Sequence, residues 1–229
     1  MQNIKSVITD EVQAGRELVA YIGRMLFDRH LTDACGGNIS LRVGDVYCMS
    51  ASLSGHMRQW QLDPDDVLVV NKNREIIAGE GTLTRETAVH FGLHENYGEY
   101  GTGVIHCHPR NLMVFTCMNK PMPPIMEATR KFGVTPTIEY APAHSPKLGE
   151  RIVASMKGRE QRIVKHAAGT IAPWHGLFLM GKNLEAAFDA VERLDTNAYV
   201  IMMSQQLGAS PMLEEESAQM EQAIANLSE

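Results

Sequence analysis

The stretch Gly103-Val104-Ile105-His106-Cys107-His108-Pro109 decides how this sequence is interpreted. Its first half is an apolar run typical of a buried strand, and Pro109 ends that strand and suits the first turn of a helix. Side chains of a strand alternate between its two faces, so His106 and His108 should point the same way, with Cys107 turned towards the core. Two neutral imidazoles in this arrangement can bind one metal ion.

A pair of histidines on a strand does not by itself establish a metal site. Such pairs also occur on solvated strand faces or as hydrogen-bonded groups of the core. A third imidazole would complete a catalytic site that keeps one coordination position open. A further histidine, His175, lies in the stretch Pro173-Trp174-His175-Gly176-Leu177-Phe178-Leu179.

Length and composition restrict the class of protein. The chain has 229 residues, 44% of them hydrophobic, which suits one large α/β domain or two small ones. A net charge of -6 without a long basic run argues against nucleic acid as a partner. No signal peptide and no run of about 18 apolar residues is present, so we expect a cytoplasmic protein without a membrane partner. The four cysteines form no CxxC pair, which favours reduced thiols.

The hydrophobic pattern predicts alternating helices and strands. Helical spacing predicts helices over residues 4–30, 85–97 with Thr84 as cap, 109–118, 146–157 and 184–198. Short apolar runs predict strands at 39–41, 46–49, 67–70, 103–108, 137–141 and 176–180, the first three antiparallel. No repeat or linker divides the chain. We therefore expect one catalytic domain over residues 1–207 and an acidic tail, mobile or packed at an edge, over 208–229.

Five motifs occur in a fixed order between about residues 10 and 206. They are Gly36-Gly37-Asn38-Ile39-Ser40, Ser54-Gly55, Glu80-Gly81-Thr82-Leu83-Thr84-Arg85-Glu86, His106-Cys107-His108 and His175-Gly176. Each motif is common alone, but the ordered set resembles the class II aldolase/adducin family of sugar-phosphate aldolases and epimerases. The resemblance implies a single α/β domain with a central, mostly antiparallel sheet flanked by helices. It also implies a homotetramer with active sites at the subunit boundaries.

The resemblance also assigns roles to individual residues. It implies one divalent metal ion per subunit held by His106, His108 and His175, commonly zinc, although manganese, cobalt and iron(II) also suit three imidazoles. It places the phosphate of a sugar substrate at Gly37, Asn38, Ser54, Gly55 and Thr84. Glycine amides, an amide side chain and hydroxyls together make a suitable anion site. Because the stretch before Gly55 is slightly longer than usual, Ser52 is an alternative to Ser54.

Arg85 departs from the family pattern, which commonly has serine at this position. An arginine here could bind the phosphate through two hydrogen bonds, or it could bind a carboxylate of the substrate. The alternative is a solvated arginine at the start of a helix, with no role in binding.

Two glutamates are candidate catalytic groups. By resemblance, Glu86 is the base that takes a hydroxyl proton from the substrate, and family epimerases tend to carry aspartate there. The alternative is an early-turn acid stabilised by the helix dipole. Glu127 stands where the aldolases have tyrosine and a related dehydratase has glutamate. It is therefore interpreted as an acid/base group or as a carboxylate that orients a metal histidine.

The remaining histidines receive structural assignments: His90 on the Glu86 helix, and His56, His144 and His166 in loops. The function we expect is a metal-dependent aldolase that cleaves a ketose 1-phosphate, such as a 5-deoxy- or methylthio-pentulose phosphate. The products are dihydroxyacetone phosphate and an aldehyde. Alternatives on the same scaffold are a dehydratase, a 4-epimerase or an oxo-acid phosphate decarboxylase. A non-catalytic interaction domain would not need three metal histidines together with Glu86.

Overall fold

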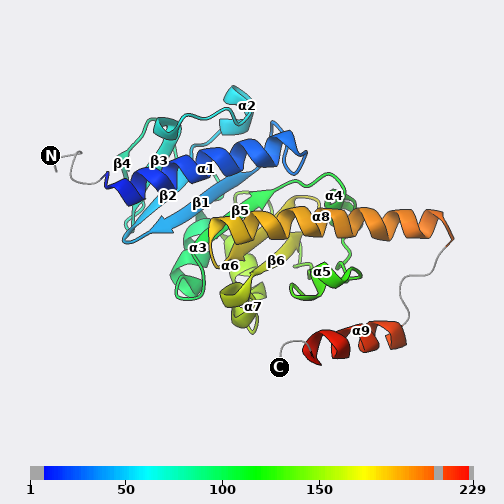
Figure 1. The fold of residues 1–229 in the computed structure, drawn as a ribbon. Coiled ribbons are helices and arrows are strands. Elements are labelled where there is room, and N and C mark those ends of the chain that lie inside the picture. Colours follow the sequence, from blue (N-terminus) through cyan, green and yellow to red (C-terminus); the bar gives the residue numbers. More distant parts are fainter. Residues whose placement is uncertain (1–7, 209–213, 227–229) are drawn as a thin grey trace.

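A seven-stranded antiparallel sheet forms the centre of the protein (Figure 1). The computed structural model describes residues 8–208 and 214–226. The strand order is β4-β3-β2-β1-β5-β7-β6, so the two halves of the chain meet where β1 pairs with β5. The strands are β1 (Asn38–Val43), β2 (Val46–Ser50), β3 (Val67–Asn71), β4 (Ile76–Ala78), β5 (Gly103–Cys107), β6 (Ala167–Ala172) and β7 (Gly176–Gly181).

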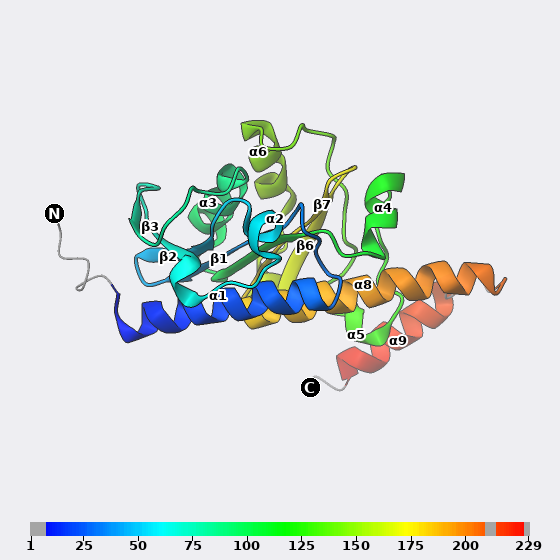
Figure 2. The ribbon, with the colours of Figure 1, turned by 90° about the horizontal axis from the view of Figure 1, so that it is seen from above.

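Helices cover both faces of this sheet. The long helices α1 and α8 pack on one face, and α3 and α6 lie on the other (Figure 2). The short helix α7 packs on the same face as α3 and α6, where its Ile163 is buried. The helices are α1 (Asp10–Asp28), α2 (Ser54–Arg58), α3 (Thr87–Tyr97), α4 (Leu112–Met118), α5 (Glu127–Arg130), α6 (Pro146–Ser155), α7 (Glu160–Lys165), α8 (Leu184–Gln206) and α9 (Glu214–Asn226), with a 3-10 turn, η2 (Pro64–Asp66). The structure thus confirms the predicted α/β domain with a central antiparallel sheet.

Strand β5 shows how the sequence alternation builds the two layers. Ile105 and Cys107 are fully buried in the core cluster that includes α1 and α8 residues. Val104 is buried in the opposite cluster, which contains residues of α3 and α6. The prediction that Cys107 points to the core is confirmed, and all four cysteines are free. His106 has the parity of Val104 and therefore lies on the α3 side of the sheet.

The α3 helix begins later than predicted. It starts at Thr87, and its N-cap residue is Glu86, so the prediction of Thr84 as the cap was wrong. Thr84 instead accepts a hydrogen bond from the Glu86 amide at its hydroxyl (3.3 Å) and from the Thr87 amide at its carbonyl (3.2 Å). The turn before the helix is therefore held by Thr84, and this turn places the Glu86 side chain at the helix start.

One predicted strand and one predicted helix boundary also differ from the structure. Residues 137–141 do not form a strand, because pairing is limited to a single bridge between Thr137 and Ile171. Pro136 and Pro142 flank this segment and supply no amide hydrogen to extend a ladder. The helix predicted over 109–118 starts only at Leu112, whose amide donates to Asp195 Oδ1 of α8 at 3.0 Å.

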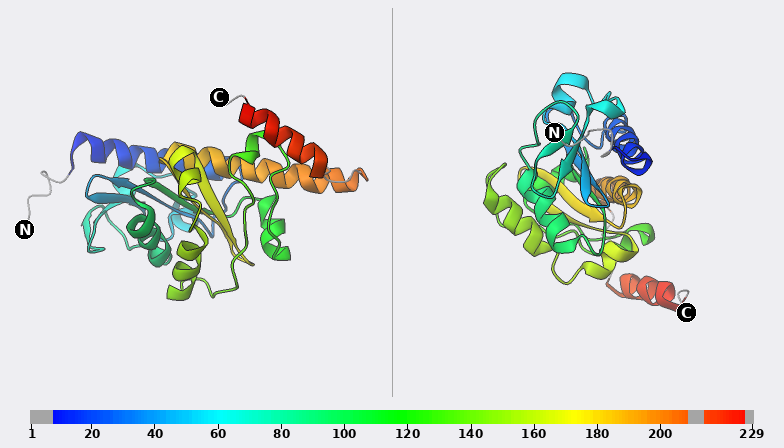
Figure 3. Two further views of the ribbon diagram at one scale, coloured as in Figure 1. Left: turned by 90° about the horizontal axis from the view of Figure 1, so that it is seen from below. Right: turned by 90° about the vertical axis from the view of Figure 1, so that its left-hand side faces the viewer.

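The C-terminal segment contains the helix α9, which Figure 3 shows beyond the main body, near α5. Arg130 of α5 bonds to Ser217 Oγ at 2.5 Å and forms an ion pair with Glu221 Oε1 at 2.9 Å. The predicted tail also includes residues 209–213 and 227–229, which lie outside the described residues. Within the described ranges, no helix has both the length and the apolar composition needed to cross a bilayer.

Candidate active site

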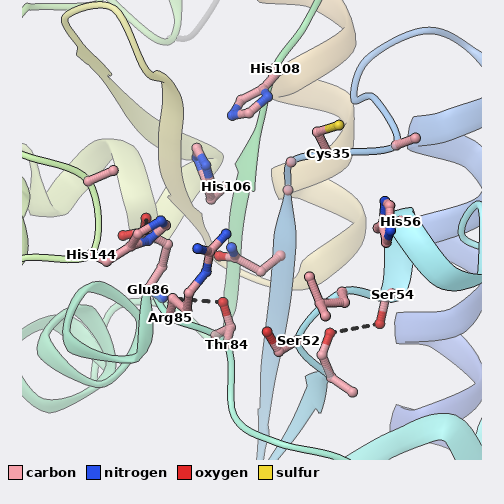
Figure 4. A pocket seen from close by; sticks show the side chains of 18 of the residues that line it. Cys35, Ser52, Ser54, His56, Thr84, Arg85, Glu86, His106, His108 and His144 are labelled. Atoms are coloured by element: carbon pink, nitrogen blue, oxygen red, sulfur yellow. Dashed lines mark hydrogen bonds and ion pairs between the residues drawn. The ribbon is translucent and has the colours of Figure 1, made fainter.

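The candidate site lies where β1 and β5 meet at the end of the sheet. Asn38, the first residue of β1, is the register partner of His106 in β5. The turn between β6 and β7 brings His175 to the same end, just before Gly176 begins β7. Figure 4 shows His106 and His108 on one side of the pocket and Glu86, at the start of α3, on another. Asn38 and His175 line the same cavity, whose volume is about 200 Å³. Residues more than 130 positions apart therefore share one site.

The three predicted metal histidines lie together. The ring centroids of His106 and His108 are 5.0 Å apart, and those of His106 and His175 are 4.7 Å apart. One nitrogen from each of the three rings lies within 4.8 Å of the others. His106 is held by stacking on Phe178, at a centroid distance of 4.0 Å and an interplanar angle of 10°. This arrangement matches what the strand alternation predicted for His106 and His108.

Hydrogen bonds determine which nitrogens face the centre of this cluster. His106 Nδ1 lies 3.0 Å from the Leu177 carbonyl, and His108 Nδ1 lies 3.0 Å from Asp33 Oδ2. Both acceptors require an N–H at Nδ1, which leaves the Nε2 lone pair free, the usual state of a metal-bound histidine. Within the described residues, His108 Nε2 and His175 Nδ1 are buried without a hydrogen-bond partner. Such unpaired buried nitrogens fit a bound divalent ion.

The protonation states of His106 and His175 also suit a metal. Burial lowers the pKa of His175 to about 4, with smaller contributions from His108 and His144. Burial also lowers the pKa of His106 well below its usual value, and the neighbouring His108 and His175 add to that effect. Neutral imidazoles at pH 7 offer lone pairs to a cation without first losing a proton.

Two glycines make room for the histidine cluster. A Cβ on Gly36 would lie 2.0 Å from Cε1 and 2.2 Å from Nδ1 of His108. A Cβ on Gly176 would lie 2.7 Å from His108 Cδ2 and 2.9 Å from His106 Cε1. Both sets of distances are far below van der Waals contact. Any side chain at these two positions would displace the imidazoles.

Glu86 lies beside the cluster as a buried carboxylate. Its side chain is 3% exposed, and its Oε1 lies 2.8 Å from His144 Nδ1 and 3.6 Å from His175 Nε2. Burial raises its pKa, an effect that the nearby His144 and Arg85 partly oppose. A carboxylate with a raised pKa is a stronger proton acceptor than one in water. The geometry therefore suits a general base.

His144 was predicted to be only a loop residue, and its position shows more. It lies in the turn before α6, at a left-handed φ of 66°, and its Nδ1 is 2.8 Å from Glu86 Oε1. No local pattern in the sequence indicates this contact, because it joins positions 58 residues apart. His56 was also assigned to a loop, but it belongs to α2 and lines the same cavity.

The predicted anion-binding residues line the same cavity: Gly37, Asn38, Ser54, Gly55, Thr84 and Arg85. Gly37 has a φ of 89°, and a Cβ there would lie 2.5 Å from Thr32 Oγ1, so only glycine fits. Ser54 Oγ already donates to the Ala51 carbonyl at 2.8 Å. Ser52, the alternative hydroxyl donor, also lines the cavity, so both serines remain candidates.

Glu127 does not join this group. It lies exposed on α5 and lines a different cavity together with Arg130 and Lys131. Sequence reasoning also missed Asp33, whose carboxylate orients His108. Metal-binding histidines commonly donate their second N–H to a carboxylate. An acidic residue close to the Gly36-Gly37-Asn38 motif was therefore a candidate acceptor for such an N–H.

Comparison with known proteins gives related enzymes. The family described as Class II Aldolase and Adducin N-terminal domain matches residues 17–202. The 5-deoxy-D-ribulose 1-phosphate aldolase of Bacillus thuringiensis serovar kurstaki is 24% identical over 200 residues, covering 87% of this chain and 89% of that protein. The 3-oxo-tetronate 4-phosphate decarboxylase of Pectobacterium atrosepticum is 24% identical over 204 residues, covering 86% and 87%. A solved L-fuculose 1-phosphate aldolase has the same fold, with a TM-score of 0.77 at 20% identity, covering 93% and 96%.

Proposed function

Because this chain belongs to the class II aldolase and adducin family, we propose that it is a divalent-metal-dependent sugar-phosphate aldolase. In this proposal it cleaves a ketose 1-phosphate into dihydroxyacetone phosphate and an aldehyde. The observation that carries the proposal is the buried carboxylate of Glu86, 3.6 Å from a histidine of the three-imidazole cluster. A 5-deoxy- or methylthio-pentulose phosphate is the proposed substrate class, supported by the relative that is a 5-deoxy-D-ribulose 1-phosphate aldolase.

The reaction needs a base, an electrophile and an anion site. A divalent ion held by His106, His108 and His175 would supply the electrophile that stabilises negative charge on the substrate oxygens. Glu86 takes the proton of the C4 hydroxyl as the C3–C4 bond breaks, and the aldehyde is released. The electron pair of that bond stays on the three-carbon fragment. C3 of this fragment then takes up the proton held by Glu86, which gives dihydroxyacetone phosphate and returns Glu86 to its carboxylate form.

The phosphate is proposed to bind in the loops around Gly37, Asn38 and Gly55. These residues line the same cavity as Glu86, so one substrate can reach both groups. Thr84 and Arg85 complete the proposed anion site, with Ser54 or Ser52 as the hydroxyl donor. Binding energy gained at the phosphate can then position the reacting carbons against Glu86.

An oxo-acid phosphate decarboxylase is the second candidate function. Arg85 lines the cavity next to Glu86 and could bind a substrate carboxylate, and one relative is a 3-oxo-tetronate 4-phosphate decarboxylase. The two candidates differ in their products, because decarboxylation releases carbon dioxide and aldol cleavage releases an aldehyde.

We also propose zinc as the metal, a homotetramer as the assembly and the cytoplasm as the location. Three imidazoles suit zinc, although manganese, cobalt and iron(II) suit them too. Two aromatic residues next to the site, Tyr140 and Trp174, pack against each other and are 56% and 58% exposed, which supports contact with a second copy of the chain. Free cysteines support a reducing compartment.

Glu127 does not line the cavity that holds Glu86 in its own chain. It can act as an acid/base group only if assembly places it at the Glu86 cavity of a second subunit. Substituting Glu86 and Glu127 separately with glutamine tests the proposal. Glu86→Gln should keep the metal and the fold while kcat falls by about 10² to 10⁴, the usual contribution of a general base. Glu127→Gln should cost much less. A fully active Glu86→Gln enzyme, or a reversed order of the two variants, would contradict the aldolase mechanism.

A further inference from the structure

A chain of buried hydrogen bonds runs from Asn38 into the protein interior. Asn38 Oδ1 bonds to His90 Nε2. The other nitrogen of that ring, His90 Nδ1, lies 2.6 Å from Ser40 Oγ, and Ser40 Oγ lies 2.8 Å from His94 Nε2. Two residues of β1 and two residues of α3, one helical turn apart, form this chain, and all four are buried. Only Asn38 also lines the substrate cavity.

Both histidines of this hydrogen-bond chain, His90 and His94, are neutral. Burial lowers the pKa of His90 to about 3 and that of His94 to about 3. A neutral imidazole has one N–H and one lone pair, so each ring donates at one nitrogen and accepts at the other. The hydrogen bonds can therefore all run in one direction or all in the other. The direction decides which end of the Asn38 amide faces the histidine.

The inner end of the chain selects between the two directions. Within the described residues, His94 Nδ1 is buried without a hydrogen-bond partner. A buried N–H without an acceptor is rarer and more costly than an acceptor without a donor. His94 therefore carries its hydrogen on Nε2 and donates it to Ser40 Oγ. Ser40 in turn donates to His90 Nδ1, which leaves the His90 hydrogen on Nε2, facing Asn38 Oδ1.

We propose that His90, Ser40 and His94 are positioning residues that fix the Asn38 side chain, with its carbonyl oxygen turned inward and its two amide hydrogens available to the substrate anion. The reverse direction would present the carbonyl oxygen to the anion, which would repel it. The inference rests on the proposed anion-binding role of Asn38. Neutral, buried partners give Asn38 this orientation without adding a charge that would compete with the phosphate.

Nitrogen NMR of the full-length protein with ¹⁵N-labelled histidine tests the direction of the chain. Two-bond ¹⁵N–¹H correlations distinguish a protonated from an unprotonated ring nitrogen. His90 and His94 should both carry hydrogen at Nε2, with Nδ1 unprotonated, and His90→Gln and His94→Gln variants assign the signals. A hydrogen at Nδ1 of His90, or a charged His90 ring at pH 7, would overturn the inference without touching the proposed function.

If the hydrogen-bond chain orients Asn38, interrupting it should weaken anion binding. Binding of inorganic phosphate, measured by calorimetry, tests this effect. Ser40→Ala and His94→Leu both interrupt the chain, and each should weaken phosphate binding about tenfold, the equivalent of one hydrogen bond of about 1.4 kcal/mol. His94→Gln places an amide N–H where Nε2–H was, so it should restore binding to within about twofold. A kinetic readout should agree, with KM for a phosphorylated ketose rising more than kcat falls.

Two controls separate this effect from general damage. Ser50→Ala removes a buried serine whose hydroxyl accepts a hydrogen bond from the Ile39 amide at 3.0 Å. Ser50 is not part of the hydrogen-bond chain from Asn38 to His94, so phosphate binding should not change. Asn38→Ala measures the contribution of Asn38 itself. If Asn38→Ala weakens binding but Ser40→Ala and His94→Leu do not, the positioning role is refuted. If Asn38→Ala leaves binding unchanged, the anion role of this loop fails, and the inference fails with it.

Discussion

Substituting Gly36 with alanine should displace His108 and weaken metal binding without unfolding the protein. The new Cβ would lie 2.0 Å from His108 Cε1 and 2.2 Å from Nδ1, whereas an ordinary contact begins at 3.4 Å. The ring would have to move by roughly 1.4 Å, while metal–ligand distances tolerate only about 0.2 Å. The shift would also disturb the contact between His108 and Asp33, which is 3.0 Å long. Loss of such an orienting contact alone costs about 10- to 100-fold in metal affinity.

Zinc affinity, measured with a competing chelator on the folded Gly36→Ala protein, should therefore fall by at least that factor, or about 1.4 to 2.7 kcal/mol. Gly158→Ala is the matched control. Gly158 has a φ of 79°, and a Cβ added there would meet nothing within 4 Å, so its variant should lose some stability but bind metal normally. Wild-type zinc affinity in Gly36→Ala would refute the assignment of His108 as a ligand.

Three other perturbations have defined outcomes. Replacing Asn38 with alanine should raise KM for a phosphorylated ketose by about tenfold or more and leave KM for the unphosphorylated analogue unchanged, and equal losses would contradict a phosphate role. Glycine in His144→Gly can adopt the φ of 66°, but the substitution removes a group that lowers the Glu86 pKa. The acidic limb of the plot of kcat against pH should therefore move to higher pH. An unchanged acidic limb would argue against the contact between His144 and Glu86. Because burial depresses the folded-state pKa of His90 and His94 to about 3, the unfolded chain binds more protons below about pH 6.5. The free energy of unfolding should therefore fall between pH 7 and 5 by on the order of 2 kcal/mol per histidine. Denaturant titrations at several pH values should show a smaller fall for His94→Gln than for the wild type. An equal fall in the two proteins would contradict this prediction.

The strand carrying His106 was predictable because its side chains alternate. Apolar Val104 and Ile105 marked the strand, and the period of two set the directions of His106, Cys107 and His108. Strand β6 was not predicted, because its sequence Ala167-Ala168-Gly169-Thr170-Ile171-Ala172 has little intrinsic preference for a strand. All six residues of the strand are buried, and β6 pairs with β7 along its whole length. Tertiary packing determines this strand.

Site residues that belong to a local sequence motif could be predicted. Site residues that are brought in by long-range contacts could not. The three candidate metal ligands, His106, His108 and His175, and the Glu86 segment came from ordered motifs. His144 was missed because its contact with Glu86 depends on a left-handed turn and on a loop that folds back from α6. Glu127 was chosen from the roles of corresponding segments in related enzymes, and the geometry of one chain does not place it near Glu86. A residue's role can be transferred only when the fold brings its side chain to the reacting atoms.

The most direct test of the central claim is product analysis of the zinc-loaded protein on a panel of phosphorylated sugars. The panel should include 5-deoxyribulose 1-phosphate, fuculose 1-phosphate and a 3-oxo-tetronate 4-phosphate, with coupled detection of dihydroxyacetone phosphate and separate detection of carbon dioxide. The aldolase account predicts dihydroxyacetone phosphate and an aldehyde in equal amounts from at least one ketose 1-phosphate, and none after metal removal. Release of carbon dioxide from the oxo acid, with no ketose 1-phosphate cleaved, would contradict it.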